Sequence, residues 1–154
     1  MDEVFFQLTL AVILGGVIGI ERRLAGKVAG VRTYALVALG ACLFSLMSKN
    51  AFVEFSGISG FDPSRIASQV VVGIGFLGAG LIVFQKNRVQ GLTTAAGLWV
   101  TAAIGMAIAY KFYDVAIFAT FLTLVIFVVL WHIERVFLKN LARTAIEHED
   151  ESHV

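Results

Sequence analysis

Five long apolar runs, separated by short charged or turn-rich breaks, constrain this chain more than any other feature of its sequence. The runs cover residues 4–20, 33–48, 67–85, 95–110 and 115–133. Each holds about 16–19 residues, near the lower limit for a helix that crosses a hydrocarbon core of about 30 Å. With 58% hydrophobic and 15% charged residues, the chain has more apolar side chains than a soluble domain of its size buries. We therefore predict an all-α transmembrane bundle of about five helices in a lipid bilayer.

The fourth and fifth runs are separated only by residues 111–114. A tight turn there predicts an antiparallel helix pair, with Tyr110, Phe112 and Tyr113 at the level of the lipid headgroups. A single re-entrant segment is the alternative. The fifth run is bulky on nearly every face and ends near Trp131, which predicts a peripheral helix that faces lipid.

The basic residues predict the orientation of the helices. Nine of the twelve lie in the breaks after the first and third runs and in the tail; only Lys49, Arg65 and Lys111 lie on the other side. Positive charge favours the cytoplasmic side, so we predict an outer N-terminus and a cytoplasmic C-terminus. Residues 1–133 then form the membrane domain, and residues 134–154 form a cytoplasmic helix with an acidic tail.

Several classes of function receive no support from the composition. A net charge of +1 lacks the basic footprint of a nucleic-acid-binding protein, so we expect no such partner. The single cysteine, Cys42, cannot form an internal disulfide, and no His, Cys or carboxylate pair is placed for acid–base or nucleophilic chemistry. We therefore expect no enzymatic activity and no cofactor, although Mg²⁺ stays open as a ligand.

Small residues recur at helical spacing inside the runs, where they let helices approach closely in lipid. The glycines expected to pack helices are Gly15, Gly19, Gly73, Gly75, Gly78, Gly80, Gly97 and Gly105. Because Gly15 and Gly19 lie on the first helix, we expect them to meet a second copy of the chain, so that the protein forms a homodimer. Residues 73–80 have an alternative interpretation as a distorted helix whose freed carbonyls bind an ion.

Charged and hydroxyl residues gather where the helices reach the cytoplasmic side. We predict a polar cluster there, with Glu21 paired to Arg32 and with Thr93 or Thr94 capping the fourth helix. The residues of the cluster are Glu21, Arg22, Arg32, Thr33, Thr93 and Thr94. Interfacial anchoring and helix capping alone are the structural alternative to a functional role.

A second polar feature precedes the third run on the outer side. Asp62 followed by Pro63 is a strong signal for the start of a helix, and Arg65 follows them. Asp62 is also a weak candidate for a metal ligand, with Glu54 as its companion, because Mg²⁺ prefers carboxylate and water oxygens.

Several motifs together resemble the MgtC/SapB family of bacterial inner-membrane proteins, from about residue 15 to residue 110. The matching segments are Gly19–Arg22, Ala29–Thr33, Asp62–Val70, Gly73–Gly80 and Gly91–Gly105. The resemblance implies a role in growth under magnesium limitation and, in pathogens, in survival inside macrophages. It also implies inhibition of the F-type ATP synthase as a mode of action.

Two functions follow from these observations. The first is a non-enzymatic regulator that docks another membrane protein, with the F-type ATP synthase as the partner that the resemblance implies. The second is an oligomeric transporter or channel for Mg²⁺ or another cation. Because no Asp, Glu, Lys, Arg or His lies at the middle of an apolar run, the sequence favours the regulator.

Overall fold

The structure, a computed structural model, describes residues 1–55, 64–85, 88–133 and 136. The chain divides into two compact units, Met1–Thr123 and Leu124–Val154. Four helical segments are long and apolar enough to cross a membrane, namely Asp2–Leu24, Val31–Asn50, Leu92–Ala109 and Tyr113–Ile133. A shorter apolar helix covers Arg65–Ala79. The predicted all-helical class of a multi-pass membrane protein is therefore confirmed.

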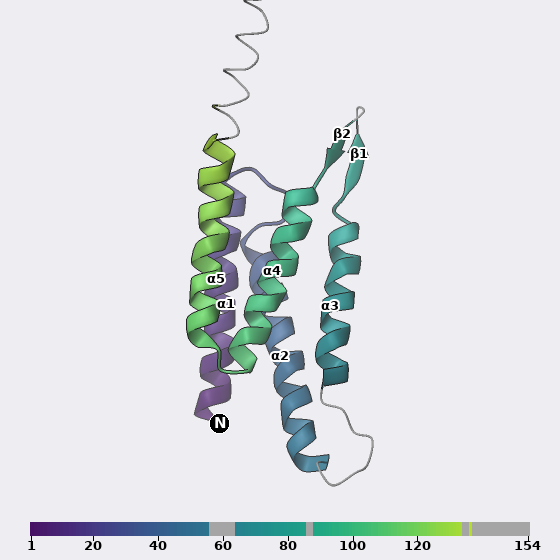
Figure 1. Cartoon of the computed structure of the whole chain (residues 1–154), viewed down its shortest axis with the longest axis vertical. Coiled ribbons are helices and arrows are strands. Elements are labelled where there is room, and N and C mark those ends of the chain that lie inside the picture. Colours follow the sequence, from purple (N-terminus) through teal and green to yellow (C-terminus); the bar gives the residue numbers. More distant parts are fainter. Residues whose placement is uncertain (56–63, 86–87, 134–135, 137–154) are drawn as a thin grey trace, which may run out of the picture. The chain divides into compact units, whose positions relative to one another are not determined.

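The first unit contains four complete helices, a small hairpin and most of a fifth helix (Figure 1). The elements are α1 (Asp2–Leu24), α2 (Val31–Phe55), α3 (Ser64–Ala79), β1 (Val83–Gln85), β2 (Arg88–Gln90), α4 (Leu92–Ala109) and α5 (Tyr113–Val125). Helix α2 packs against α1, α3 and α4, and α4 also contacts α1 and α3. Helices α2 and α4 therefore form the centre of the unit.

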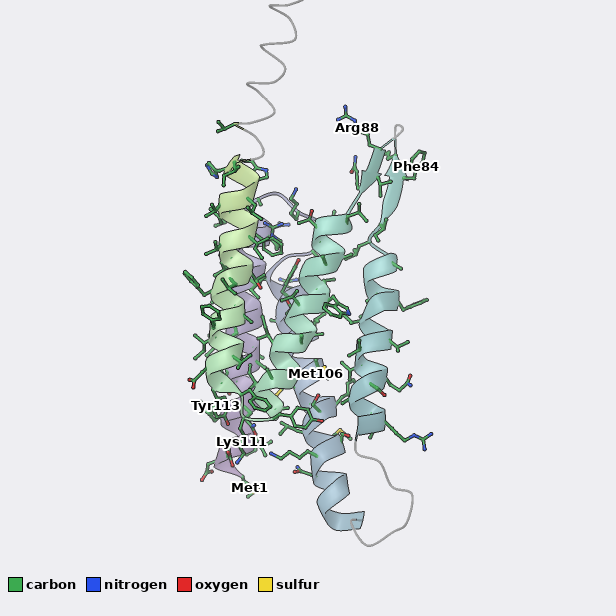
Figure 2. All side chains as sticks on the ribbon, in the orientation of Figure 1. Met1, Phe84, Arg88, Met106, Lys111 and Tyr113 are labelled. Atoms are coloured by element: carbon green, nitrogen blue, oxygen red, sulfur yellow. The ribbon has the colours of Figure 1, made fainter. Side chains whose placement is uncertain are left out.

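The two ends of the first unit differ in the elements that they contain. One end, called the hairpin end below, comprises residues 21–33 and 80–94. It holds the end of α1, the start of α2, the strands and the start of α4 (Figure 1). The other end, called the N-terminal end, holds the start of α1 and the turn between α4 and α5 (Figure 2). The described basic residues of the two breaks predicted to be cytoplasmic, Arg22, Arg23, Lys27, Arg32 and Arg88, belong to the hairpin end.

The third apolar run differs from its prediction, because its helix ends at Ala79 rather than at residue 85. The amides of Leu81 and Ile82 donate to carbonyls three residues earlier, so the last turn tightens and the helix stops. Val83–Gln85 and Arg88–Gln90 then form two antiparallel strands, called the hairpin, in which Phe84 pairs with Val89. β-branched and aromatic residues favour such strands, and their apolar character made this segment resemble a continuing helix.

Three glycines bring helices of the first unit into direct backbone contact. A Cβ on Gly15 would lie 2.7 Å from the carbonyl oxygen of Tyr34, and one on Gly105 would lie 2.3 Å from that of Ala38. A Cβ on Gly19 would lie 2.6 Å from the Cα of Val31. The predicted packing role of these glycines is confirmed. Gly15 and Gly19 pack within one copy of the chain, against α2 and the segment before it, rather than facing a second copy. The homodimer itself stays a prediction.

The remaining glycines of the prediction behave differently from one another. Gly97 is buried in α4, and a Cβ on Gly78 would lie in ordinary contact with Ala95, at 3.4 Å. Around Gly73 and Gly75, in contrast, a Cβ would meet nothing within 4 Å. Their predicted packing role is therefore wrong within one copy of the chain. Residues 73–79 are regular α-helix, which does not support the distorted ion-binding alternative.

A tight turn joins α4 to α5, as predicted. Lys111 has a positive φ of 66° in this turn, and its ammonium lies 2.5 Å from the carboxylate of Glu3. This hydrogen bond raises the pKa of Lys111. The ring of Tyr113 meets that of Phe6 edge-on, with centroids 5.7 Å apart. Figure 2 shows Lys111 and Tyr113 beside Met1 at the N-terminal end. Both segments form separate helices that are long enough to cross a membrane, which favours the antiparallel pair over the re-entrant alternative.

Helix α5 buries only one narrow side within the first unit. Ala116, Thr120 and Thr123 are buried, whereas Phe118 and Phe121 are exposed. This pattern agrees with the predicted peripheral helix.

In the second unit, residues Ile126–Leu130 form a π-helical segment, and the ring of Trp131 meets that of His132 edge-on. The predicted cytoplasmic helix and tail, residues 134–154, lie outside the described residues apart from Val136.

Candidate functional site

The hairpin end contains a buried ion pair at the end of α1. Arg22 is only 3% exposed, and its Nη2 donates to Oε1 of Glu21 at 2.6 Å, while its Nε donates to Oε2. Such a bidentate contact between guanidinium and carboxylate is stronger and more directional than a single charged contact. The side chain of Glu21 is 17% exposed, so one edge of the pair reaches the surface.

Tyr34 connects the start of α2 to the start of α4. Its side chain is completely buried, and its hydroxyl donates to the backbone oxygen of Thr94 at 3.3 Å. The ion pair lies at the same end of the unit, at the end of α1. Glu21, Arg22, Tyr34 and Thr94 are together called the polar network below. Sequence reasoning missed Tyr34, whose only signal was a phenol one residue after Thr33 in an otherwise apolar run.

Arg32 and Thr33 lie at the same end but outside this network. The predicted pairing of Glu21 with Arg32 is wrong, since both carboxylate oxygens of Glu21 accept hydrogen bonds from Arg22. Arg32 and Thr33 are exposed at the start of α2, where they line two adjoining pockets. Tyr34, two residues further along α2, lies on the opposite, buried side of the helix.

The predicted threonine cap of α4 is also wrong. The N-cap residue is Gly91, with a left-handed φ of 91°, and no side chain caps the helix. A Cβ at Gly91 would lie only 2.0 Å from the carbonyl oxygen of Leu81, so glycine is required for the chain to pass. The helix consequently starts at Leu92, which leaves Thr93 exposed and buries Thr94 inside the first turn.

A pocket of about 610 Å³ with both apolar and polar walls opens beside this network. It lies between the loop after α1 and the hairpin, and its polar side chains come from Lys27, Gln85, Gln90, Thr93 and Thr94. An ammonium, two amides and two hydroxyls can bind a partner through hydrogen bonds. No group of three or more His, Cys, Asp or Glu residues that could hold a metal occurs in the described ranges.

The predicted outer feature is only partly described. Arg65 is exposed in the first turn of α3, and its carbonyl accepts a hydrogen bond from Ser68. Asp62, the candidate metal ligand, and Pro63 lie outside the described residues, as does the side chain of Glu54. Mg²⁺ binding by Asp62 therefore stays a prediction.

Several buried polar side chains are bonded to the backbone, whereas the hydroxyl of Ser45, which is completely buried, has no hydrogen-bond partner among the described residues. Gln7 is 2% exposed, and its amide donates to the carbonyls of Ile108 and Ala109, at 2.7 and 3.1 Å. Both carbonyls lie at the end of α4, and that of Ile108 also accepts a hydrogen bond from the amide of Lys111. Thr101, Thr120 and Thr123 donate to carbonyls four residues earlier. A lone glutamine in an apolar run was the signal that sequence reasoning left unused.

Comparison with known proteins agrees with the architecture. The family model described as "MgtC family" matches residues 8–136. The "putative magnesium transporter YhiD" of Escherichia coli K12 is 47% identical over 126 residues, which cover 80% of this chain and 59% of that protein. Protein MgtC of Salmonella typhimurium LT2 is 43% identical over 124 residues, covering 80% of this chain and 51% of that protein.

Protein SrpB of Synechococcus elongatus is 41% identical over 127 residues, which cover 77% of this chain and 70% of that protein. The chain thus spans little more than half the length of the first relatives above. No solved structure matches it significantly. The family model covers most of the five-helix region, including the hairpin end, and the relatives match about four-fifths of the chain. The chain therefore belongs to the MgtC family.

Proposed function

We propose that this protein is a non-enzymatic regulator in the bacterial inner membrane that supports growth when Mg²⁺ is scarce. In this proposal the hairpin end faces the cytoplasm and docks another membrane protein. The F-type ATP synthase is the partner suggested by the family resemblance. The observation that carries the proposal is the exposed apolar hairpin, held next to a buried polar network.

The hairpin offers a surface suited to protein binding. Val83, Phe84 and Val89 are 54%, 71% and 52% exposed, and Arg88 lies beside them. Figure 2 shows Phe84 and Arg88 projecting from the hairpin beyond the helices. Exposed apolar residues rimmed by polar ones mark interaction sites. The Tyr34 hydrogen bond to Thr94 joins the starts of α2 and α4 next to this surface.

The close packing of the helices gives less support to a cation pathway through one copy of the chain. Gly105 of α4 touches the backbone of α2, and the hydroxyls of Thr101 and Thr120 are bonded to their own helices. A pathway needs polar groups that replace the water around an ion. Cation transport nevertheless stays the second candidate, because one relative is named a putative magnesium transporter.

Growth and flux measurements together separate the two functions. In a strain that lacks its own copy, Phe84→Ser is expected to abolish rescue of growth at low Mg²⁺ while the protein still inserts in the membrane at normal levels. Phe112→Ser is the matched control, since Phe112 is 61% exposed at the N-terminal end. Purified protein in liposomes is expected to give no Mg²⁺ flux above empty liposomes. Robust flux, or full rescue by Phe84→Ser, would contradict the regulator.

The orientation is tested by cysteine labelling in a Cys42→Ser background. Asp2 and Arg88 are exposed and are separated by α1, α2 and α3. With the N-terminus outside, a membrane-impermeant maleimide is expected to label Asp2→Cys in spheroplasts. It should label Arg88→Cys only after permeabilisation. Labelling of both from one side would show that an even number of helices crosses between them.

A further inference from the structure

A long apolar groove of about 700 Å³ runs between α2 and α3. Its walls include Leu36, Gly40 and Phe44 from α2 and Val70, Gly73 and Leu77 from α3. From Arg32 to Phe44 the groove follows α2 for about 18 Å at 1.5 Å per residue. This length slightly exceeds half of a hydrocarbon core of about 30 Å, which is the depth of one lipid leaflet.

The glycines in the groove walls leave space that the protein does not fill. A Cβ on Gly40 or on Gly73 would meet nothing within 4 Å, whereas one on Gly15 or Gly105 would collide with a neighbouring helix. The first pair therefore widens the groove instead of bringing helices together. In a bilayer, an open apolar groove of this depth is filled by an apolar chain rather than by water.

One end of the groove is basic. Arg32 and Thr33 line both the groove and an adjoining pocket of about 390 Å³, which Arg23 and Gly30 also line. The aliphatic part of Arg23 lies along Gly30, with its Cδ 3.4 Å from where a Cβ would be. Arg23 and Arg32 are exposed, and neither forms an ion pair with a carboxylate in the described ranges. Two arginines thus line one small pocket.

We propose that the groove and this basic pocket together bind one anionic glycerophospholipid. An acyl chain lies between α2 and α3, and the phosphodiester accepts hydrogen bonds from Arg23 and Arg32. Guanidinium groups suit this ligand because their planar donors bind phosphate oxygens in pairs. The two positive charges also disfavour a headgroup that carries its own ammonium. The continuity of the pocket with the groove at Arg32 and Thr33 distinguishes this site from a simple basic anchor.

The test measures lipid binding by the purified full chain in detergent, using native mass spectrometry and thermal unfolding. Phosphatidylglycerol is the probe, and phosphatidylcholine is the comparison lipid. Wild type is expected to retain one phosphatidylglycerol and to gain thermal stability from it. Arg32→Gln is expected to bind it at least about tenfold more weakly, because a charge-assisted contact is lost. Arg65→Gln, at an exposed arginine of the N-terminal end, is the control and should bind normally.

A second variant tests the groove itself. Gly73→Leu should fold, because its side chain enters open space, but should fill the groove and abolish retention of the lipid. Gly16→Leu, at a glycine with equally open surroundings on α1, should not.

Three outcomes would overturn the proposal. The first is equal binding of phosphatidylcholine, and the second is an equal gain in stability from inorganic phosphate alone. The third is a Gly73→Leu protein that keeps the lipid but loses an oligomer seen by light scattering, since the groove would then hold a second copy. None of these measurements depends on a regulated partner, so they are independent of the proposed function.

Discussion

Leucine at position 15 is expected to prevent stable folding of the first unit, whereas leucine at position 16 leaves it folded. The two glycines are neighbours on α1, but their surroundings are opposite. A Cβ on Gly15 would lie 2.7 Å from the Tyr34 oxygen and 2.8 Å from the Cβ of Ala38, and one on Gly16 would meet nothing within 4 Å. Overpacking costs about 1–3 kcal/mol where side chains can adjust. Here the obstacle includes the backbone of α2, so we expect Gly15→Leu to lower the free energy of unfolding by about 3 kcal/mol or more.

The measurement is the thermal midpoint and the folded fraction by size-exclusion chromatography in one detergent. Gly15→Ala should fall between wild type and Gly15→Leu, because even a methyl group meets the α2 backbone. Gly16→Ala should be neutral or slightly stabilising, since alanine is the better helix former by up to about 1 kcal/mol. If the two positions respond equally, then α1 does not pack on α2 through Gly15.

Glu21→Gln is expected to cause the second large loss of stability. It removes the carboxylate that accepts two hydrogen bonds from the guanidinium of Arg22, which is 3% exposed. Breaking a buried pair by removing one member costs about 3–5 kcal/mol. Because the side chain of Glu21 is 17% exposed, we expect a value near 3 kcal/mol. The free energy of unfolding in denaturant checks this value, and Arg65→Gln, which removes an exposed charge, is the control.

A charge-swap series identifies the partner of Glu21 independently. Glu21→Arg should fold poorly. Adding Arg32→Glu should not restore folding, because Arg32 is exposed and lines two pockets instead of pairing with Glu21. Recovery of the thermal midpoint by that double variant would mean that Glu21 and Arg32 form the stabilising pair after all.

Helix number and class were predictable because lipid imposes a simple rule on sequence. The apolar runs had to be helices, and the short break at residues 111–114 had to be a turn. The strands Val83–Gln85 and Arg88–Gln90 were not predictable in the same way. Val83, Phe84 and Val89 are as apolar as a membrane helix, and only cross-strand pairing of Phe84 with Val89 distinguishes the hairpin.

The composition of the polar end was also easier to predict than its pairing. Glu21, Arg22 and Thr94 lie at the hairpin end, as their places at the ends of the apolar runs suggested. Which side chain pairs with Glu21 depends on the rotation of about 100° per residue around each helix. Arg22, the next residue in the sequence, is the partner in place of Arg32 across the loop. The same rotation separates Gly15 from Gly16, and no spacing rule reveals which of them meets another helix.

The shortness of α3 has a consequence for the surrounding membrane. A helix of 16 residues is about 24 Å long, some 6 Å less than a typical hydrocarbon core. If α3 spans the bilayer, the lipid beside it must thin, or the helix must stand nearly upright with its flanking polar residues reaching outward. Such hydrophobic mismatch gives this side of the protein a preference for thin bilayer regions. It would also draw together membrane proteins that deform the lipid in the same way, before any direct contact forms.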